Sequence, residues 1–128
     1  INQRVVARFL SDGLFENQLP KICGANARRL AIAVSALHRE FARTAVSWRE
    51  PAGGYFLWVE LPDGHSTADL LRLAIEEGVS FVPGSAFSPA GGFRSSLRLC
   101  FIPVDDQRLA AGISCLRAAY DRLLEGTA

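Results

Sequence analysis

The most unusual residue in the sequence is Arg98, because it lies in the middle of an apolar run that favours a β-strand. Residues 96–102 read Ser-Leu-Arg-Leu-Cys-Phe-Ile, so Arg98 shares a strand face with Cys100 and Ile102. An unpaired charge at such a position is costly, and it needs an anionic partner with further hydrogen bonds. Two interpretations are open. Arg98 forms a structural ion pair, for example with Glu60 on another strand, or it is a fork that binds an anionic ligand.

The loop at residues 83–87, Pro-Gly-Ser-Ala-Phe, is a second candidate. It directly follows an expected strand, where active-site loops often lie. Gly84 would let a ligand approach the backbone closely. The simpler alternative is a turn that packs Phe87 into the interior. The sequence contains neither of the phosphate-binding glycine patterns, GxGxxG and GxxxxGKS/T, so this loop is not predicted to hold a phosphate.

The other reactive side chains form no recognisable catalytic or metal-binding group. His38 and His65 have no nucleophile and carboxylate near them in the sequence that would indicate a triad. The only lysine, Lys21, lies near an expected helix start and is expected to face solvent. From the residues alone, we predict no nucleophile, general base or metal site in this chain.

The three cysteines, Cys23, Cys100 and Cys115, are widely spaced and form no CxxC pair or cluster with the histidines. Cys100 and Cys115 lie in apolar patterns, which predicts buried free thiols. Free thiols are typical of a reducing compartment, so we expect a cytoplasmic protein. No apolar run approaches the ~20 residues of a membrane helix, and no signal peptide opens the sequence.

The composition is typical of one globular domain over residues 1–128. The chain is 49% hydrophobic and 21% charged, which is too apolar for a disordered protein. Its net charge of +1 provides no general field for nucleic acid or a membrane surface, and we expect contact with neither. The sequence starts at Ile1 rather than Met and already reads as a helix, so we expect it to be a piece of a longer polypeptide.

Two helices are expected before the first strand. The first should end near Gly13, which suits the left-handed conformation that terminates helices. Its apolar positions are Val5, Val6, Phe9 and Leu10. The second is expected from about Pro20 to Arg43, because proline starts a helix and is disfavoured inside one. Its apolar face is Leu30, Val34, Leu37 and Phe41.

Two further helices have clear start signals. Ser66 is the expected N-cap of a helix that ends at Gly78, with Asp69 in the capping-box position. Asp105 or Asp106 is expected to cap the final helix. The apolar face of that helix is Leu109, Ile113, Leu116, Tyr120 and Leu123.

Four segments are expected to be strands. They are residues 46–49, 55–61, 79–82 and 96–102. The first two flank a Pro-Ala-Gly-Gly turn and should form a hairpin. The second is apolar on both faces except at Glu60, which predicts a central strand covered on both sides. The strands on either side of the third helix are expected to be parallel neighbours. The element order predicts an α+β fold, with a small mixed β-sheet packed with helices.

Three ordered motifs resemble the C-terminal part of class I and II aminotransferases, which are pyridoxal-phosphate enzymes of fold type I. The motifs are PAGGYFLW at residues 51–58, GVSFVPGSAF at residues 78–87 and SLRL at residues 96–99. The resemblance covers nearly the whole chain and is closest to the 2-aminoadipate and branched-chain or aromatic aminotransferase-like group. It implies that the chain is the small domain of an enzyme that moves an amino group from an amino acid to a 2-oxo acid.

The resemblance implies a role for three residues. In the family, the arginine of the last strand binds the substrate α-carboxylate, and it matches Arg98, which favours the ligand fork over the ion pair. The aromatic residue after the PxGG turn and the phenylalanine of the PGxxF loop line the pocket for the substrate side chain. They match Phe56 and Phe87. No catalytic, cofactor-binding or metal-binding residue of the family falls in this chain.

The same resemblance indicates what the chain lacks. The Schiff-base lysine and the residues that hold pyridoxal 5'-phosphate belong to the family's large domain, and Lys21 does not match that lysine. We therefore expect the chain to be inactive alone. In the parent polypeptide, a homodimer by family resemblance, Val5, Val6, Phe9 and one face of the 55–61 strand are expected to pack on the large domain.

Two alternatives remain open. A similar module forms the effector-sensing half of GntR/MocR-type bacterial transcription regulators, behind a winged-helix DNA-binding domain. A free-standing carboxylate-binding module is the third possibility. The coding sequence upstream of Ile1 distinguishes the three.

Overall fold

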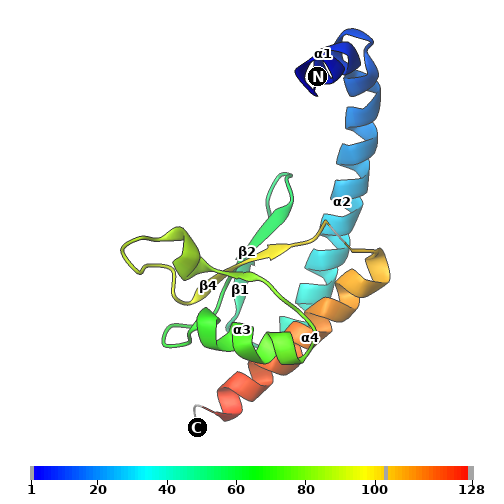
Figure 1. Ribbon diagram of the computed structural model, residues 1–128. Helices are drawn as coiled ribbons and strands as arrows, with labels where there is room; N and C mark the ends of the chain where they lie inside the picture. Colours follow the sequence, from blue (N-terminus) through cyan, green and yellow to red (C-terminus); the bar gives the residue numbers. More distant parts are fainter. Residues whose placement is uncertain (1, 103, 127–128) are drawn as a thin grey trace.

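The computed structural model describes residues 2–102 and 104–126 and confirms the α+β class expected from the sequence (Figure 1). Its elements, in chain order, are α1 (Asn2–Ser11), α2 (Leu14–Phe41), β1 (Ser47–Arg49), β2 (Phe56–Glu60), α3 (Thr67–Glu76), β3 (Val82–Pro83), the 3₁₀ turn η1 (Gly84–Phe87), β4 (Ser96–Cys100) and α4 (Asp106–Glu125). The third strand is shorter than predicted, since only the last residue of the predicted segment, Val82, is paired.

The four strands form one sheet in the order β1-β2-β4-β3, and each neighbouring pair is antiparallel. The expected β1–β2 hairpin is confirmed. The expectation of a mixed sheet is wrong. The strands that flank α3, β2 and β3, are not hydrogen-bonded neighbours. Strands β2 and β3 do run parallel to each other, but β4 lies between them and pairs with both. The last strand in sequence therefore takes a central place, beside β2.

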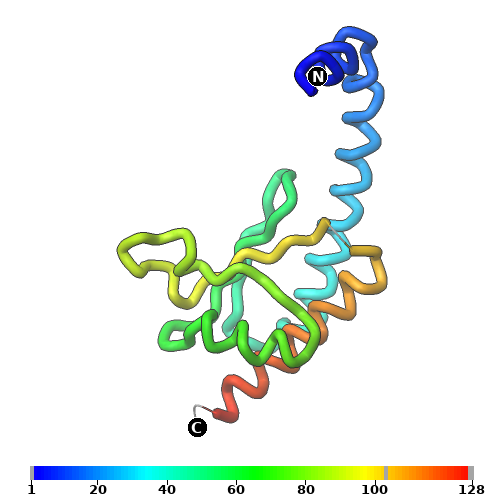
Figure 2. The backbone as a smooth tube through the Cα atoms, in the orientation of Figure 1, coloured from blue at the N-terminus to red at the C-terminus, as the bar shows by residue number. Residues whose placement is uncertain are grey.

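The helices cover only one face of this sheet. Leu57 and Val59 of β2, with Leu97 and Leu99 of β4, point into the core, while the alternate residues point away from it. The prediction that β2 is covered on both faces is therefore wrong. Its outward residues are aromatic, which made both faces look buried, yet Phe56 is 41% exposed. Figure 2 shows α3, α4 and the second half of α2 on one side of the strands.

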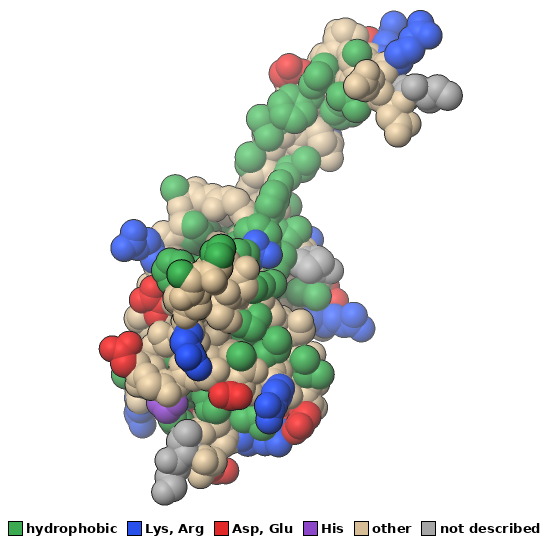
Figure 3. All heavy atoms as spheres, turned by 60° about the vertical axis from the view of Figure 1, so that its left-hand side comes forward, with side chains coloured by type: hydrophobic (Ala, Val, Ile, Leu, Met, Phe, Trp, Pro, Cys, Tyr) green, Lys and Arg blue, Asp and Glu red, His purple; other side chains and the backbone are tan. Residues whose placement is uncertain are grey.

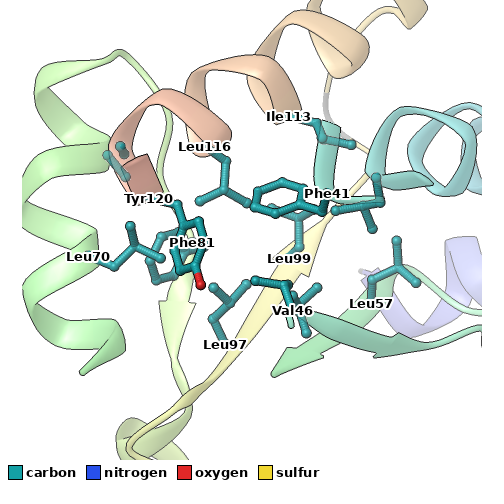
Figure 4. Close-up of a cluster of buried hydrophobic side chains, with 14 of the residues drawn as sticks. Phe41, Val46, Leu57, Leu70, Phe81, Leu97, Leu99, Ile113, Leu116 and Tyr120 are labelled. Atoms are coloured by element: carbon teal, nitrogen blue, oxygen red, sulfur yellow. The ribbon is translucent and has the colours of Figure 1, made fainter. Parts of the chain in front are cut away.

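The core lies between the inward face of the sheet and these three helices (Figure 4). Leu37 and Phe41 of α2 are buried there, and Leu30 and Val34 pack partly against it, as the helical spacing predicted. All five apolar positions predicted for α4 are also buried: Leu109, Ile113, Leu116, Tyr120 and Leu123. The core thus fixes the sheet through its inward residues and leaves the outward ones available for other contacts.

Three of the four expected helix signals are confirmed. Ser66 caps α3 by accepting a hydrogen bond from the Asp69 amide, and Asp105 caps α4 by accepting one from the Arg108 amide. Gly13 has a φ of 69°, as predicted. The prediction that α2 starts at Pro20 is wrong, because Pro20 lies inside the helix. Residues 14–24 are all exposed, so water can hydrate the backbone carbonyl that the missing proline N–H leaves without a helical partner.

Helix α1 and the first half of α2 form an arm that projects from the rest of the molecule (Figures 1 and 2). No residue of α1 is buried, and the buried residues of α2 begin at Ala33. Figure 3 shows hydrophobic side chains along this arm. Within residues 2–102 and 104–126, none of the helices is long and apolar enough to cross a membrane.

Candidate functional site

The outward face of the sheet carries a row of residues centred on Arg98. The pairing of β2 with β4 puts Trp58 opposite Arg98, and the pairing of β3 with β4 puts Val82 on its other side. Arg49 of the edge strand lies opposite Trp58 and extends the row. Directly opposed residues share a face of a sheet, so these four side chains lie on the side that the helices leave open.

Two phenylalanine rings hold the guanidinium group of Arg98. Its central carbon, Cζ, lies 4.0 Å from the ring centre of Phe56 and 4.8 Å from that of Phe87. A guanidinium group at such distances is attracted to the electron-rich faces of the rings, with a free energy of about 0.5–2 kcal/mol. The structure therefore brings together all three residues that the sequence singled out.

The hydrogen-bonding capacity of Arg98 is unused among the described residues. No carboxylate there lies within ion-pair distance of its guanidinium group, and its buried Nε has no hydrogen-bond partner. The alternative partner, Glu60, lies farther along β2, opposite Ser96 and Ser47, and is exposed. The structural ion pair that the sequence left open is therefore absent from this part of the chain, and the arginine can still accept an anion.

Phe87 reaches Arg98 because η1 turns it outward. The alternative prediction, that the turn packs Phe87 into the interior, is wrong, since the residue is 42% exposed. Gly84 at the start of η1 is buried, and a Cβ there would lie 2.8 Å from the Ser96 carbonyl oxygen and would also collide with Phe93. Gly84 therefore permits a close approach of the chain to itself rather than to a ligand.

Thr67 fixes the segment that joins η1 to β4. Its buried hydroxyl lies 3.0 Å from the Arg94 carbonyl oxygen and 2.8 Å from that of Ser96, and its amide donates to the Arg94 carbonyl oxygen at 2.9 Å. The first turn of α3 thus holds the start of β4, two residues before Arg98. Thr67 is fully buried and positions the start of β4. This residue was not singled out from the sequence.

Two further aromatic residues complete the site and were missed from the sequence. The ring of Trp58 lies 5.9 Å from that of Phe87 and 5.7 Å from that of Phe93, the latter at right angles. The signal was present, because Trp58 is two residues after Phe56 and so shares its strand face. The assumption that both faces of β2 are buried concealed it. The outward face is therefore an aromatic platform around the guanidinium group of Arg98, with Arg49 at its edge.

Of the remaining reactive residues, Cys100 lies on the same outward face, opposite Phe56 of β2. The prediction of buried thiols is wrong for Cys100, which is exposed because it lies on the outward face of β4, and Cys115 is half-buried. His38 contacts the Trp48 ring at 4.9 Å, and the ring of His65 lies 6.3 Å from that of Tyr120. No group of three or more metal-binding side chains occurs within residues 2–102 and 104–126.

Lys21 is exposed, as predicted, and lines a pocket between α2 and Tyr55 that does not include Arg98. A lysine that forms a Schiff base with the cofactor must lie near the amino group of a substrate whose carboxylate is bound at Arg98. The described residues therefore do not fit a pyridoxal 5'-phosphate site.

Comparison with known proteins identifies the family of the chain. The family described as aminotransferase class I and II matches residues 1–114. The chain is 36% identical to 2-aminoadipate transaminase of Thermus thermophilus over 97% of its length and 31% of that protein.

A solved structure of α-aminoadipate aminotransferase from Thermus thermophilus, in complex with N-(5'-phosphopyridoxyl)-L-leucine, superposes with a TM-score of 0.90 at 36% identity. It covers 97% of this chain, and the match spans 31% of the solved chain. An uncharacterized HTH-type transcriptional regulator of Escherichia coli is less similar, at 27% identity over 81% of this chain and 22% of the regulator. The chain spans less than a third of the length of these relatives. With the family matched over residues 1–114, the chain belongs to the class I and II aminotransferases.

Proposed function

We propose that this chain, a single domain over residues 1–128, is the substrate-carboxylate-binding small domain of a pyridoxal-phosphate-dependent aminotransferase. The observation that carries the proposal is the state of Arg98. Its guanidinium group is clamped by Phe56 and Phe87, and no anion among the described residues satisfies it. The substrates would be an amino acid and a 2-oxo acid, which share the α-carboxylate that such a fork recognises.

Arg98 would bind this carboxylate through two parallel hydrogen bonds and so fix the orientation of the substrate Cα. The rings of Phe56 and Phe87 restrict rotation of the guanidinium group, which reduces the entropy lost when the substrate binds. Together with Trp58, they offer an apolar wall to the substrate side chain. This arrangement contributes binding and positioning, and none of these residues transfers a proton.

The cofactor would be held outside this chain. Pyridoxal phosphate supplies the electron sink for amino-group transfer, and no residue near Arg98 fits its attachment. The solved relative carries a phosphopyridoxyl adduct of leucine, which supports the same cofactor for the parent polypeptide. We infer that the 128-residue chain alone is inactive.

The partners would be the large domain of the same polypeptide and, in the parent, a second copy of it. The relatives are about three times as long as this chain. The exposed apolar residues of the arm, Val5, Val6 and Phe9, offer a surface on which such a domain could pack. The second copy is inferred from the family resemblance.

A regulator is the second candidate, because the Escherichia coli HTH-type protein matches the same region. The experiment that separates the two is an assay of the parent polypeptide with pyridoxal phosphate, an amino acid donor and a 2-oxo acid acceptor. Formation of the new amino acid supports the enzyme. Cofactor binding without turnover, in a parent with a winged-helix domain before the large domain, supports the regulator and contradicts the enzyme.

A further inference from the structure

A pocket of about 460 Å³ lies between the exposed half of α2 and the residue that precedes β2. The polar residues that line it are Gln18, Lys21, Asn26, Arg29 and Tyr55. Lys21, Ala25 and Arg29 follow one another at steps of four, which places them on one face of the helix. The pocket is separate from the platform around Arg98, although Tyr55 is the neighbour of Phe56 in sequence.

The lining of this pocket is cationic. It contains a lysine and an arginine and no carboxylate. Among residues 2–102 and 104–126, neither Lys21 nor Arg29 has an ion pair, whereas the adjacent Arg28 is 3.3 Å from a carboxylate oxygen of Asp106. The two positive charges of the pocket are therefore not neutralised by the described part of the chain.

Arg29 provides a second, independent observation that favours a ligand in this pocket. Its Nε is buried and has no hydrogen-bond partner among the described residues. A buried donor without an acceptor is unfavourable, and native structures rarely keep one without water, an ion or a ligand. An anion beside Arg29 would accept from Nε and a terminal nitrogen together, in the fork geometry that arginine favours.

We propose that this pocket binds a dianionic phosphate group, as inorganic phosphate or a phosphate monoester. Two positive charges match the charge of the dianion. The amides of Gln18 and Asn26 and the phenol of Tyr55 add neutral donors on the same pocket wall. A carboxylate would neutralise only one of the two cations, which favours phosphate over an acidic side chain or a carboxylic acid.

The test is a titration of the 128-residue chain with inorganic phosphate, followed by calorimetry and by amide chemical shifts at constant ionic strength. We expect saturable binding with shifts at residues 18–29 and at Tyr55. Lys21→Gln and Arg29→Gln should each weaken the affinity about tenfold or more, since each loses a charge-assisted contact. Arg28→Gln is the matched control. It removes the same charge from the next helix position and should leave the affinity nearly unchanged.

Two arms identify the ligand class. Acetate, which neutralises only one of the two cations, should bind at least tenfold more weakly than phosphate at the same concentrations. Tighter carboxylate binding would overturn the phosphate assignment. Lys21 is exposed, so its variant should fold normally even if Arg29→Gln does not. Absence of saturable phosphate binding, or equal weakening by Arg28→Gln, would overturn the site itself.

Discussion

At the scale of single residues, Arg98 is oriented by aromatic rings and not by a carboxylate. Its Cζ lies 4.0 Å and 4.8 Å from the ring centres of Phe56 and Phe87, and its Nε has no acceptor among residues 2–102 and 104–126. Since no ion pair has to break, a bound carboxylate would add its hydrogen bonds without replacing existing ones. Under the proposed function, the site therefore needs no ion pair to break before it binds an anion.

In the parent polypeptide, Arg98→Leu should lower kcat/KM by about two to four decades. The variant loses a charge-assisted bidentate contact, with roughly 3–5 kcal/mol of transition-state stabilisation. Arg98→Lys should restore only part of the rate, because an ammonium group cannot form the fork. Steady-state kinetics with an amino acid and a 2-oxo acid provide the measurement.

Arg72→Leu is the control for this experiment, because Arg72 is an exposed arginine of α3, and the helices pack on the other face of the sheet. It should retain near-normal kcat/KM. Thermal melts of the 128-residue chain should show that Arg98→Leu is about as stable as the original sequence, since it breaks no ion pair. A folded Arg98→Leu enzyme with near-normal kcat/KM would remove Arg98 from the site.

Gly84→Ala should destabilise the chain by about 1–3 kcal/mol. The new methyl group would meet the backbone oxygens of Phe93 and Ser96, which cannot move away as a flexible side chain could. Gly53→Ala is the comparison, because a Cβ at Gly53 has no atom within 4 Å. Urea unfolding of both variants measures the difference, and equal stability of the two would contradict the proposed close packing.

The sequence singled out three residues of the candidate site, which the structure brings together, but it did not indicate their surroundings. Arg98 was recognisable as a lone charge in an apolar strand, and Phe56 and Phe87 by family resemblance. Trp58 was not recognised, because the sequence does not tell whether an aromatic residue of a strand packs against a helix or lies on an open face of the sheet. The exposure of Cys100 was missed because a cysteine in an apolar strand is equally ambiguous.

At the scale of elements, local signals were reliable and pairings were not. The caps at Ser66 and Asp105 depend on neighbouring residues, so a short sequence window contains them. The place of β4 between β2 and β3 depends on contacts between distant segments, which no local pattern reports. Pro20 was expected to start α2 because a proline inside a helix leaves a backbone carbonyl without its hydrogen bond. In this exposed part of α2, water can supply that hydrogen bond.

A polar network between α2 and α4 should make stability depend on pH. Ser114 Oγ donates to Glu40 Oε1 at 2.8 Å, and Arg117 Nη1 donates to the Glu40 carbonyl oxygen at 2.6 Å. The hydrogen bonds from Ser114 and then Arg39 lower the pKa of Glu40 below its ordinary value of 4.5. The network is therefore fully stabilising above the ordinary pKa, and this contribution is lost as the pH falls through the lowered one.

Glu40→Gln should accordingly be less stable than the original chain at about pH 6, and the difference should shrink in acid. Urea unfolding over a pH series gives the free energy of unfolding for both. Glu16→Gln, an exposed position on the same helix without an ion pair among the described residues, should show little difference at any pH. A Glu40→Gln difference that stays constant with pH would exclude the carboxylate as its source.

At the scale of the whole molecule, the arm of α1 and the first half of α2 projects from the body and contributes no buried residue to the core. Val5 and Val6 are 63% and 57% exposed, and Leu10, Phe15 and Leu19 continue the apolar surface toward the body. Apolar patches of this kind on a protein favour association with another surface. In the absence of a large domain, the nearest available surface is the arm of a second copy.

Sedimentation velocity should therefore detect oligomers of the 128-residue chain that dissociate on dilution. Phe9→Glu should shift the distribution to monomer, because it places a charge within the patch without touching the core. Gln3→Glu adds the same charge to α1 without removing an apolar group, and should leave association nearly unchanged. A monomer at all concentrations would show that the arm does not associate with itself.

Along β2 and β4, residues that maintain the fold alternate with residues that face the candidate site. Leu57 and Val59 of β2 and Leu97 and Leu99 of β4 build the core, whereas Phe56, Trp58 and Arg98 form the outward platform. Under the proposed function, a mutation of an outward residue would alter the preferred ligand while the fold persists. Specificity can therefore drift in evolution through residues that sit directly beside those on which folding depends.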